Sequence, residues 1–288
     1  MPENLKALRN RIRSIGKTKK ITRAMEMVSA AKLRKSEGVM KSTRPFLHKI
    51  QELLGRLALS TGAQEHPLFQ RPSTGYPVVL LFTSDKGLCG AFNAHLIKRA
   101  VKELEKDPDL RVIAVGRKGN DFLKRHYPGR IEASHVDLGG QLDGAWTDAM
   151  ANNLQERFRA GEYSRIELIY PHFISTAANR PVMERYLPLE PAAFGVSEEE
   201  ASEPIDYILE PTPERVFEAL LPRFLQTKIY LTMAETFTSE HASRMMAMNN
   251  ATKNCEELGS SLTLRLNKAR QAAITTEIIE IVSGAEAL

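Results

Sequence analysis

Cysteine is scarce in this chain of 288 residues, and its scarcity excludes two classes of protein. Cys89 and Cys255 are the only cysteines, and they lie far apart in the sequence. A disulfide-stabilised secreted fold or a cysteine-based zinc site would need more cysteines at closer spacing. We therefore expect a protein of a reducing compartment in which both thiols are free.

Long apolar runs are also missing. No stretch reaches the roughly 20 residues that a membrane-spanning helix needs, and no apolar segment follows the basic N-terminus as a secretory signal requires. We therefore expect no direct membrane insertion. We also expect no removable leader, because the motifs quoted below begin within the first twenty positions. The seven histidines include no pair at ligand spacing, so no metal site is expected.

Proline is absent from two long stretches, which predicts two long helices. The first stretch lies between Pro2 and Pro45, and the second runs from Pro222 to Leu288. Proline ends or kinks helices, whereas the Lys, Arg, Ala, Met and Leu that fill the first stretch favour them. As helices the two stretches would be on the order of 60 and 100 Å long. Such helices most economically pack on each other as an antiparallel coiled coil.

The middle of the chain has a different pattern, in which short β-branched runs alternate with helical ones. Strands are expected at 78–83, 111–115, 166–170 and 182–187, and helices near 91–104 and 142–159. This alternation predicts an inserted Rossmann-like α/β domain with a mostly parallel sheet. We therefore expect a long N-terminal helix in 1–60, a central α/β domain in 75–195 and a long C-terminal helix in 208–288.

The last helix becomes steadily more apolar toward its end. Its apolar residues point around most of the helix circumference: Ala272, Ala273, Ile274, Ile278, Ile279, Ile281 and Val282. A helix of this kind must be enclosed by protein or by membrane. Glutamates interrupt the run well short of a membrane span. The remaining interpretation is a helix tip surrounded by partner subunits.

The N-terminal helix is strongly basic and changes its apolar face. Its first 35 residues hold eleven Lys or Arg against Glu3 and Glu26, a local charge of +9. This run raises the alternative of a nucleic-acid binder. A solvated helix face is the more common origin, and no aromatic residue interleaves the run for base stacking. One apolar stripe holds Leu5, Leu8, Ile12 and Ile15, whereas Ile21, Met25 and Val28 fall on the opposite side. The helix is therefore expected to meet its coil partner with one face and something else with the other.

Two glycine-containing loops, Ser84–Gly90 and Gly116–Asn120, follow predicted strands. Nucleotide phosphates often bind where such a loop enters a helix, so a nucleotide-dependent enzyme is a second alternative. Neither loop has phosphate-loop spacing or a Gly-x-Gly-x-x-Gly pattern. A tight turn in which Gly87 and Gly90 supply positive φ is favoured. No catalytic constellation is recognisable, and we expect no cofactor.

Three segments closely resemble the gamma subunit of F-type ATP synthase: Arg11–Lys32, Ser84–Gly90 and Asn267–Thr275. Residues 239–252 extend the resemblance, which covers essentially the whole chain. It implies a noncatalytic rotor shaft inside a ring of three alpha and three beta subunits. One copy of this chain would serve each ring, and ATP would be made or hydrolysed on the beta subunits. The lower part would stand on the membrane c ring beside the epsilon subunit.

The resemblance also implies the contact residues. Arg270, Gln271, Thr275 and Glu277 would contact the loops of the alpha–beta ring, and Arg23 and Met25 would face the beta subunits. Tyr207 and Glu210 resemble the foot that meets the c ring and epsilon. Chloroplast members carry an inserted cysteine pair that is missing here, so thiol regulation is not expected. A bacterial enzyme on the cytoplasmic side of the plasma membrane is expected instead.

Overall fold

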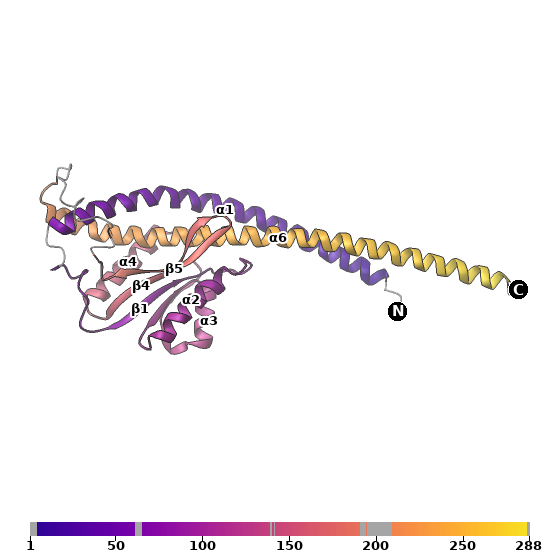
Figure 1. Cartoon of the computed structure of the whole chain (residues 1–288), viewed down its shortest axis with the longest axis horizontal. Helices are drawn as coiled ribbons and strands as arrows, with labels where there is room; N and C mark the ends of the chain where they lie inside the picture. Colours follow the sequence, from indigo (N-terminus) through magenta and orange to yellow (C-terminus); the bar gives the residue numbers. More distant parts are fainter. Residues whose placement is uncertain are drawn as a thin grey trace. The chain divides into compact units, whose positions relative to one another are not determined.

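The structure is a computed structural model that describes residues 5–60, 65–138, 140, 142–190, 194 and 209–286. It divides into two compact units, one formed by Met1–Ala30 with Arg244–Leu288 and the other by Ala31–Ser243. Two long helices, α1 (Leu5–Ser60) and α6 (Pro213–Glu286), contribute to both units (Figure 1). The expected pair of long terminal helices is therefore present.

The two helices run antiparallel in the first unit. Thr22 Oγ1 lies 2.8 Å from Thr252 Oγ1, and Lys19 Nζ lies 3.0 Å from a carboxylate oxygen of Glu256. Residues with higher numbers on α1 contact residues with lower numbers on α6, as expected for an antiparallel pair. At this register Leu5 lies opposite Arg270. The remaining turns of α6 have no described turn of α1 beside them.

Proline does not end either helix. Pro45 lies inside α1 and Pro222 lies inside α6, although an interior proline costs a helix about 3 kcal/mol. Buried side chains flank both prolines, with Leu47 and Ile50 after the first and Leu221 beside the second. Tertiary packing of these residues offsets the lost backbone hydrogen bond. Pro213 stands at the start of α6, where a missing N–H costs nothing.

The second unit contains a five-stranded sheet in the order β3-β2-β1-β4-β5. All neighbours pair in parallel except β4 and β5, which form an antiparallel hairpin. The predicted Rossmann-like, mostly parallel fold is confirmed. The strands are β1 (Tyr76–Phe82), β2 (Arg111–Val115), β3 (Ile131–His135), β4 (Tyr163–Ser175) and β5 (Ala178–Leu187). The helices of this region are α2 (Phe92–Lys106), α3 (Arg117–His126), the short 3-10 helix η2 (Pro128–Arg130) and α4 (Gly144–Arg159).

The sheet separates two cores. Along β1, Val78 and Leu80 point into one core and Val79 and Leu81 into the other, as the alternation of a strand dictates. Helices α2 and α3 cover the smaller core. Helix α4 covers the larger one together with side chains from the long helices, which include Leu54, Leu57, Phe217 and Leu221. The parts of α1 and α6 within this unit are therefore built into its core.

The Ser84–Gly90 loop is a turn, whereas residues 117–120 of the other predicted loop form the start of α3. One prediction about the turn was also wrong. Positive φ occurs at Leu88 (62°) and Gly90 (61°), and Gly87 is not among the positive-φ residues. The Ser84 hydroxyl donates to the Lys86 carbonyl at 2.7 Å, which closes the turn early and places the left-handed residue one position later. Gly116 has φ of 98°, and a Cβ there would lie 2.1 Å from the Thr83 carbonyl oxygen, so only glycine fits.

Candidate functional site

The end of α6 is the most prominent apolar surface of the first unit. Five aliphatic side chains there are between 47% and 71% exposed: Ile274, Ile278, Ile279, Ile281 and Val282. Soluble proteins rarely leave such a row in water unless it contacts another molecule. These side chains are exposed in the structure, as expected if a partner encloses this end of the helix.

Four of the predicted contact residues lie in this exposed part of α6. Arg270, Gln271, Thr275 and Glu277 are all exposed. At about 100° per residue, Arg270 and Glu277 form one row, and Gln271 and Thr275 form a second row roughly 130° away. The Thr275 hydroxyl donates to the Gln271 carbonyl at 3.0 Å. The structure thus offers one charged row and one amide and hydroxyl row to a surrounding partner.

Two further predicted contact residues, Arg23 and Met25, lie on α1. Arg23 points into solvent and pairs with Glu26 at 3.2 Å, and Met25 is half-buried. Ile21 and Val28 beside them are about 60% exposed, whereas Thr22 and Ser29 are buried, and Thr22 contacts Thr252 of α6. Small polar residues fill the inner side and apolar residues face outward. This inversion agrees with the predicted change of face.

The six predicted contact residues on the long helices form two groups rather than one site. The register of the first unit places Met25 opposite Asn249 and Asn250 on α6. About 20 residues of helix separate that position from Arg270, which corresponds to roughly 30 Å along the axis. Glu210 is exposed next to Pro211 in the second unit. Tyr207 lies outside the described residues.

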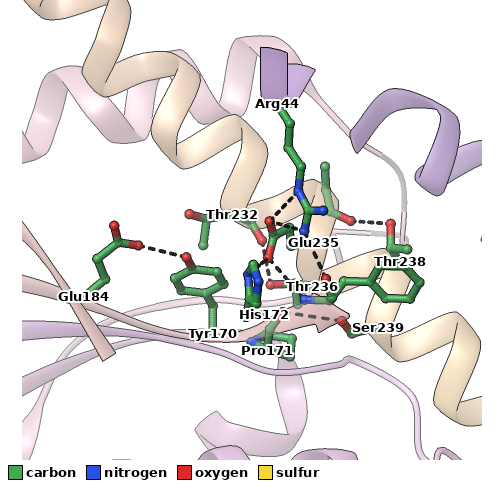
Figure 2. Close-up of polar contacts among 12 residues, drawn as sticks. Arg44, Tyr170, Pro171, His172, Glu184, Thr232, Glu235, Thr236, Thr238 and Ser239 are labelled. Carbon is green, nitrogen blue, oxygen red and sulfur yellow. Dashed lines mark hydrogen bonds and ion pairs between the residues drawn. The ribbon is translucent and has the colours of Figure 1, made fainter. Parts of the chain in front are cut away.

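A polar cluster that the sequence did not reveal surrounds Glu235, whose side chain is only 4% exposed. Figure 2 shows Arg44 of α1 and His172 of β4 converging on this carboxylate of α6. Arg44 donates to Oε1 from Nε at 3.1 Å and from Nη2 at 2.8 Å. His172 Nδ1 lies 3.0 Å from Oε2, and the Phe173 N–H donates to the same oxygen at 3.2 Å. Each carboxylate oxygen therefore has two partners.

Arg44 also joins the strand directly. Its Nη2 donates to the Phe173 carbonyl at 3.0 Å in addition to Glu235. One guanidinium and one carboxylate thus tie α1, α6 and β4 together. Because the Glu235 carboxylate is paired and hydrogen-bonded, its burial is tolerated.

The helix around Glu235 is enclosed on all sides, and every residue from 232 to 242 is buried. Several side-chain hydroxyls of this segment donate hydrogen bonds to backbone carbonyls of the same helix. Thr236 donates to the Thr232 carbonyl at 2.8 Å, and Thr238 donates to the Ala234 carbonyl at 2.7 Å. Ser239 instead donates to the Pro171 carbonyl of β4 at 3.4 Å (Figure 2). The small hydroxyl residues let β4 pack close to the helix.

A second polar link joins the hairpin to α6. The Tyr170 hydroxyl of β4 donates to Glu184 of β5 at 2.8 Å, and Lys228 of α6 pairs with the same carboxylate. Burial, reinforced by the Glu184 charge, raises the pKa of Tyr170 well above its ordinary value, so the phenol remains a donor. The β4–β5 hairpin is thus held to the long helix at two points.

The loop where a nucleotide phosphate would bind is filled by the chain itself. Asp85 Oδ1 accepts the N–H of Arg117 at 3.0 Å and that of Asp137 at 3.1 Å. Thr83 Oγ1 accepts the N–H of Gly119 at 2.9 Å. The first N–H groups of α3 therefore donate to side chains of the preceding loop and strand end, where a bound phosphate would otherwise accept them. This arrangement favours the turn interpretation over the nucleotide alternative.

The described residues lack two other features. None of the described helices combines the length and the apolar content that a membrane span requires. No group of three or more His, Cys, Asp or Glu in this part of the chain is arranged to hold a metal ion. Cys89 is buried and Cys255 is partly exposed, and neither forms a disulfide bond with another described residue.

Comparison with known sequences gives one consistent family. The family model described as ATP synthase matches residues 4–288. The ATP synthase gamma chain of Symbiobacterium thermophilum is 41% identical over 292 residues and covers 100% of this chain and 99% of its own length. The ATP synthase gamma chain of Flavobacterium johnsoniae is 41% identical over 288 residues, with 99% of both chains covered.

Comparison with solved structures finds chains of ATP synthases with a similar fold. A chain of the central stalk and c-ring structure of the Tetrahymena thermophila mitochondrial ATP synthase is 25% identical, with a TM-score of 0.61 over 80% of this chain and 99% of that one. A chain of the Euglena gracilis mitochondrial ATP synthase is 18% identical and shares the fold, with a TM-score of 0.67 over 98% of this chain and 94% of that one.

Proposed function

The chain belongs to the gamma chains of F-type ATP synthase, and we propose that α1 and α6 form a shaft inside a ring of three alpha and three beta subunits. It is the central-stalk rotor of the enzyme and not a catalytic subunit. Rotation of this shaft couples ion flow through the membrane c ring to ATP synthesis and hydrolysis, which occur on the beta subunits.

The observation that carries this proposal is the exposed apolar end of α6. The turns beyond Arg270 extend for about 24 Å with no described part of α1 beside them. Aliphatic side chains make few directional bonds, so an apolar sleeve around this end would hold the axis and still allow it to turn. We propose that the alpha–beta ring forms this sleeve around Ile274–Val282.

Coupling requires that the shaft present different surfaces in different directions. A ligand or partner shifts a conformational equilibrium only by its difference in affinity for the two states, and a nearly complete shift needs several kcal/mol. We propose that Arg270, Gln271, Thr275 and Glu277 make and break charge-assisted and neutral hydrogen bonds with loops of the ring at each step. Arg23 and Met25 would meet the beta subunits farther along the shaft.

A segment before α6 is proposed to meet the membrane part. Tyr207 and Glu210 would contact the c ring and the epsilon subunit. We propose that residues 1–60 and 208–288 act as the two coiled-coil helices and that 75–195 form the central domain. The bacterial relatives at about 40% identity support a place on the cytoplasmic side of the bacterial plasma membrane, with attachment through other subunits.

Purification of the tagged full-length chain from its native host in mild detergent tests this function. We expect it to bring alpha and beta subunits in threefold excess, together with epsilon and c subunits, and to hydrolyse ATP. Recovery of the chain alone, or with nucleic acid, would contradict the proposal and reopen the basic helix or the central sheet as the functional site.

Arg270→Ala tests the charged row of α6. The side chain is exposed, so the free chain should keep its stability. We expect ATP hydrolysis by the assembled complex to fall about tenfold, the equivalent of ~1.4 kcal/mol of lost interaction. Lys268→Ala is the matched control, because it removes a positive charge from the same stretch but from outside this row. Equal losses in both variants would show that only net charge matters.

A further inference from the structure

A groove with a volume of about 580 Å³ lies between α2 and α3. The two helices lie side by side and cover the smaller core (Figure 1). The larger core, which contains the buried parts of α1 and α6, lies on the other side of the sheet. The groove therefore belongs to a surface that the rotor contacts proposed above do not use.

The floor of the groove is apolar. Ile97 and Val101 of α2 and Phe122 of α3 line it and remain only partly buried. The Phe122 ring also packs against the His126 ring, with 4.5 Å between their centroids. These side chains form a contiguous apolar strip that the folded chain does not cover. A partner that brings apolar side chains would remove this strip from water.

The rim of the groove is basic. Lys98, Lys118 and Arg125 are exposed lining residues, and none of them forms an ion pair with another described residue. Asp121 is the one acidic lining residue in the described part of the chain, so the charged rim carries +3 − 1 = +2 with His126 neutral.

Other cations of the same two helices are already paired. Arg99 and Lys106 of α2 both pair with Glu103, at 3.3 and 3.1 Å. Arg117 of α3 pairs with Asp137. The cations without an ion pair on these helices thus include the three that surround the apolar strip. A net positive rim around an apolar floor is the pattern expected for a partner of opposite charge.

We propose that this groove binds an acidic amphipathic helix of another protein subunit. The walls of the groove are two helices, which expose no strand edge for β-pairing, and an inserted helix would place apolar residues at i, i+3 or i+4 along the strip. Carboxylates on both sides of that apolar row would meet Lys98, Lys118 and Arg125. The apolar floor and Asp121 disfavour a nucleic-acid phosphate backbone as the occupant.

Site-specific photo-crosslinking in the assembled complex tests the proposal. A benzophenone amino acid replaces Val101 in the full-length chain, the complex is purified from its host and irradiated, and mass spectrometry identifies the joined segment. We expect a single crosslink to a segment of another subunit with apolar residues at helical spacing and flanking Asp or Glu. No crosslink, or one to a basic segment, to a segment without that spacing or to nucleic acid, would overturn the proposal.

Charge reversal at the rim supplies the second measurement. Lys98→Glu combined with Arg125→Glu should reduce the crosslink yield at least fivefold, because like charges would then face each other. Lys102→Glu is the matched control, since Lys102 is exposed on α2 but does not line the groove. All three positions are exposed, so thermal unfolding should change little. An unchanged yield in the double variant, or an equal loss in the control, would overturn the role of the rim.

Discussion

Met25→Lys is expected to lower the number of protons pumped per ATP hydrolysed by about fivefold or more, with little effect on folding. Met25 is half-buried on α1 and lies between the exposed Ile21 and Val28. A cation placed in the proposed contact with the beta subunits would pair with a carboxylate of the ring in some rotary positions and lie unpaired in others. A bias of about 1.4 kcal/mol already changes the relative population of two states tenfold.

Met25→Leu is the matched control, since it keeps a side chain of similar volume without the charge. Proton pumping and ATP hydrolysis are measured together in membrane vesicles, and thermal unfolding is measured on the free chain. We expect the leucine variant to couple normally. Normal coupling in the lysine variant would show that Met25 does not face the ring.

Glu235→Ala is expected to lower the free energy of unfolding of the second unit by about 3 kcal/mol. The substitution leaves the Arg44 guanidinium with one carbonyl partner and removes the acceptor of the Phe173 N–H. Removing one member of a buried, hydrogen-bonded ion pair typically costs about 3–5 kcal/mol, and the partial exposure of Arg44 places this case at the lower end.

Denaturant unfolding of the full-length chain measures this effect. Glu257→Ala is the matched control, because Glu257 is an exposed glutamate of the same helix and its loss should change stability by less than about 0.5 kcal/mol. Glu235→Gln should have an intermediate effect, because the amide oxygen can still accept one of the hydrogen bonds. A loss below about 1 kcal/mol in the alanine variant would show that the cluster does not hold the three elements together.

The long helices and the central strands were predictable because their signals are local. The absence of proline and the abundance of helix formers indicated α1, and dense β-branched runs indicated β1, β2 and β4. The family resemblance rested on three motifs and is confirmed by relatives that match over the full chain. The proposed contact residues followed from that resemblance, since an exposed arginine or glutamate carries no signal of its own.

The elements that were missed have weak local signals. Strand β3 is a sheet edge whose sequence, Ile-Glu-Ala-Ser-His, is only partly apolar and only partly buried. Helix α3 has ten residues and begins directly after Gly116, so it resembled a continued loop. Both are stabilised by neighbours in the sheet more than by their own sequence.

The Glu235 cluster could not be predicted for a different reason. A glutamate in a helix is normally solvated, and its partners Arg44 and His172 lie far away in the sequence. Only the pairing of α1, α6 and β4 brings the three together. A possible signal was the run of small hydroxyl residues around Glu235, which is unusual for a helix surface and typical of close packing.

The larger core has a consequence for how the chain is made. It joins Leu54 and Leu57, near the start of the chain, to Phe217 and Leu221, about 160 residues later. At a synthesis rate of roughly 5–20 residues per second, the first pair waits on the order of ten seconds for the second to leave the ribosome. Until then the apolar side of α1 and the part of the larger core that α6 covers remain in water. The newborn chain is therefore expected to depend on chaperones until α6 has been made as far as Phe237.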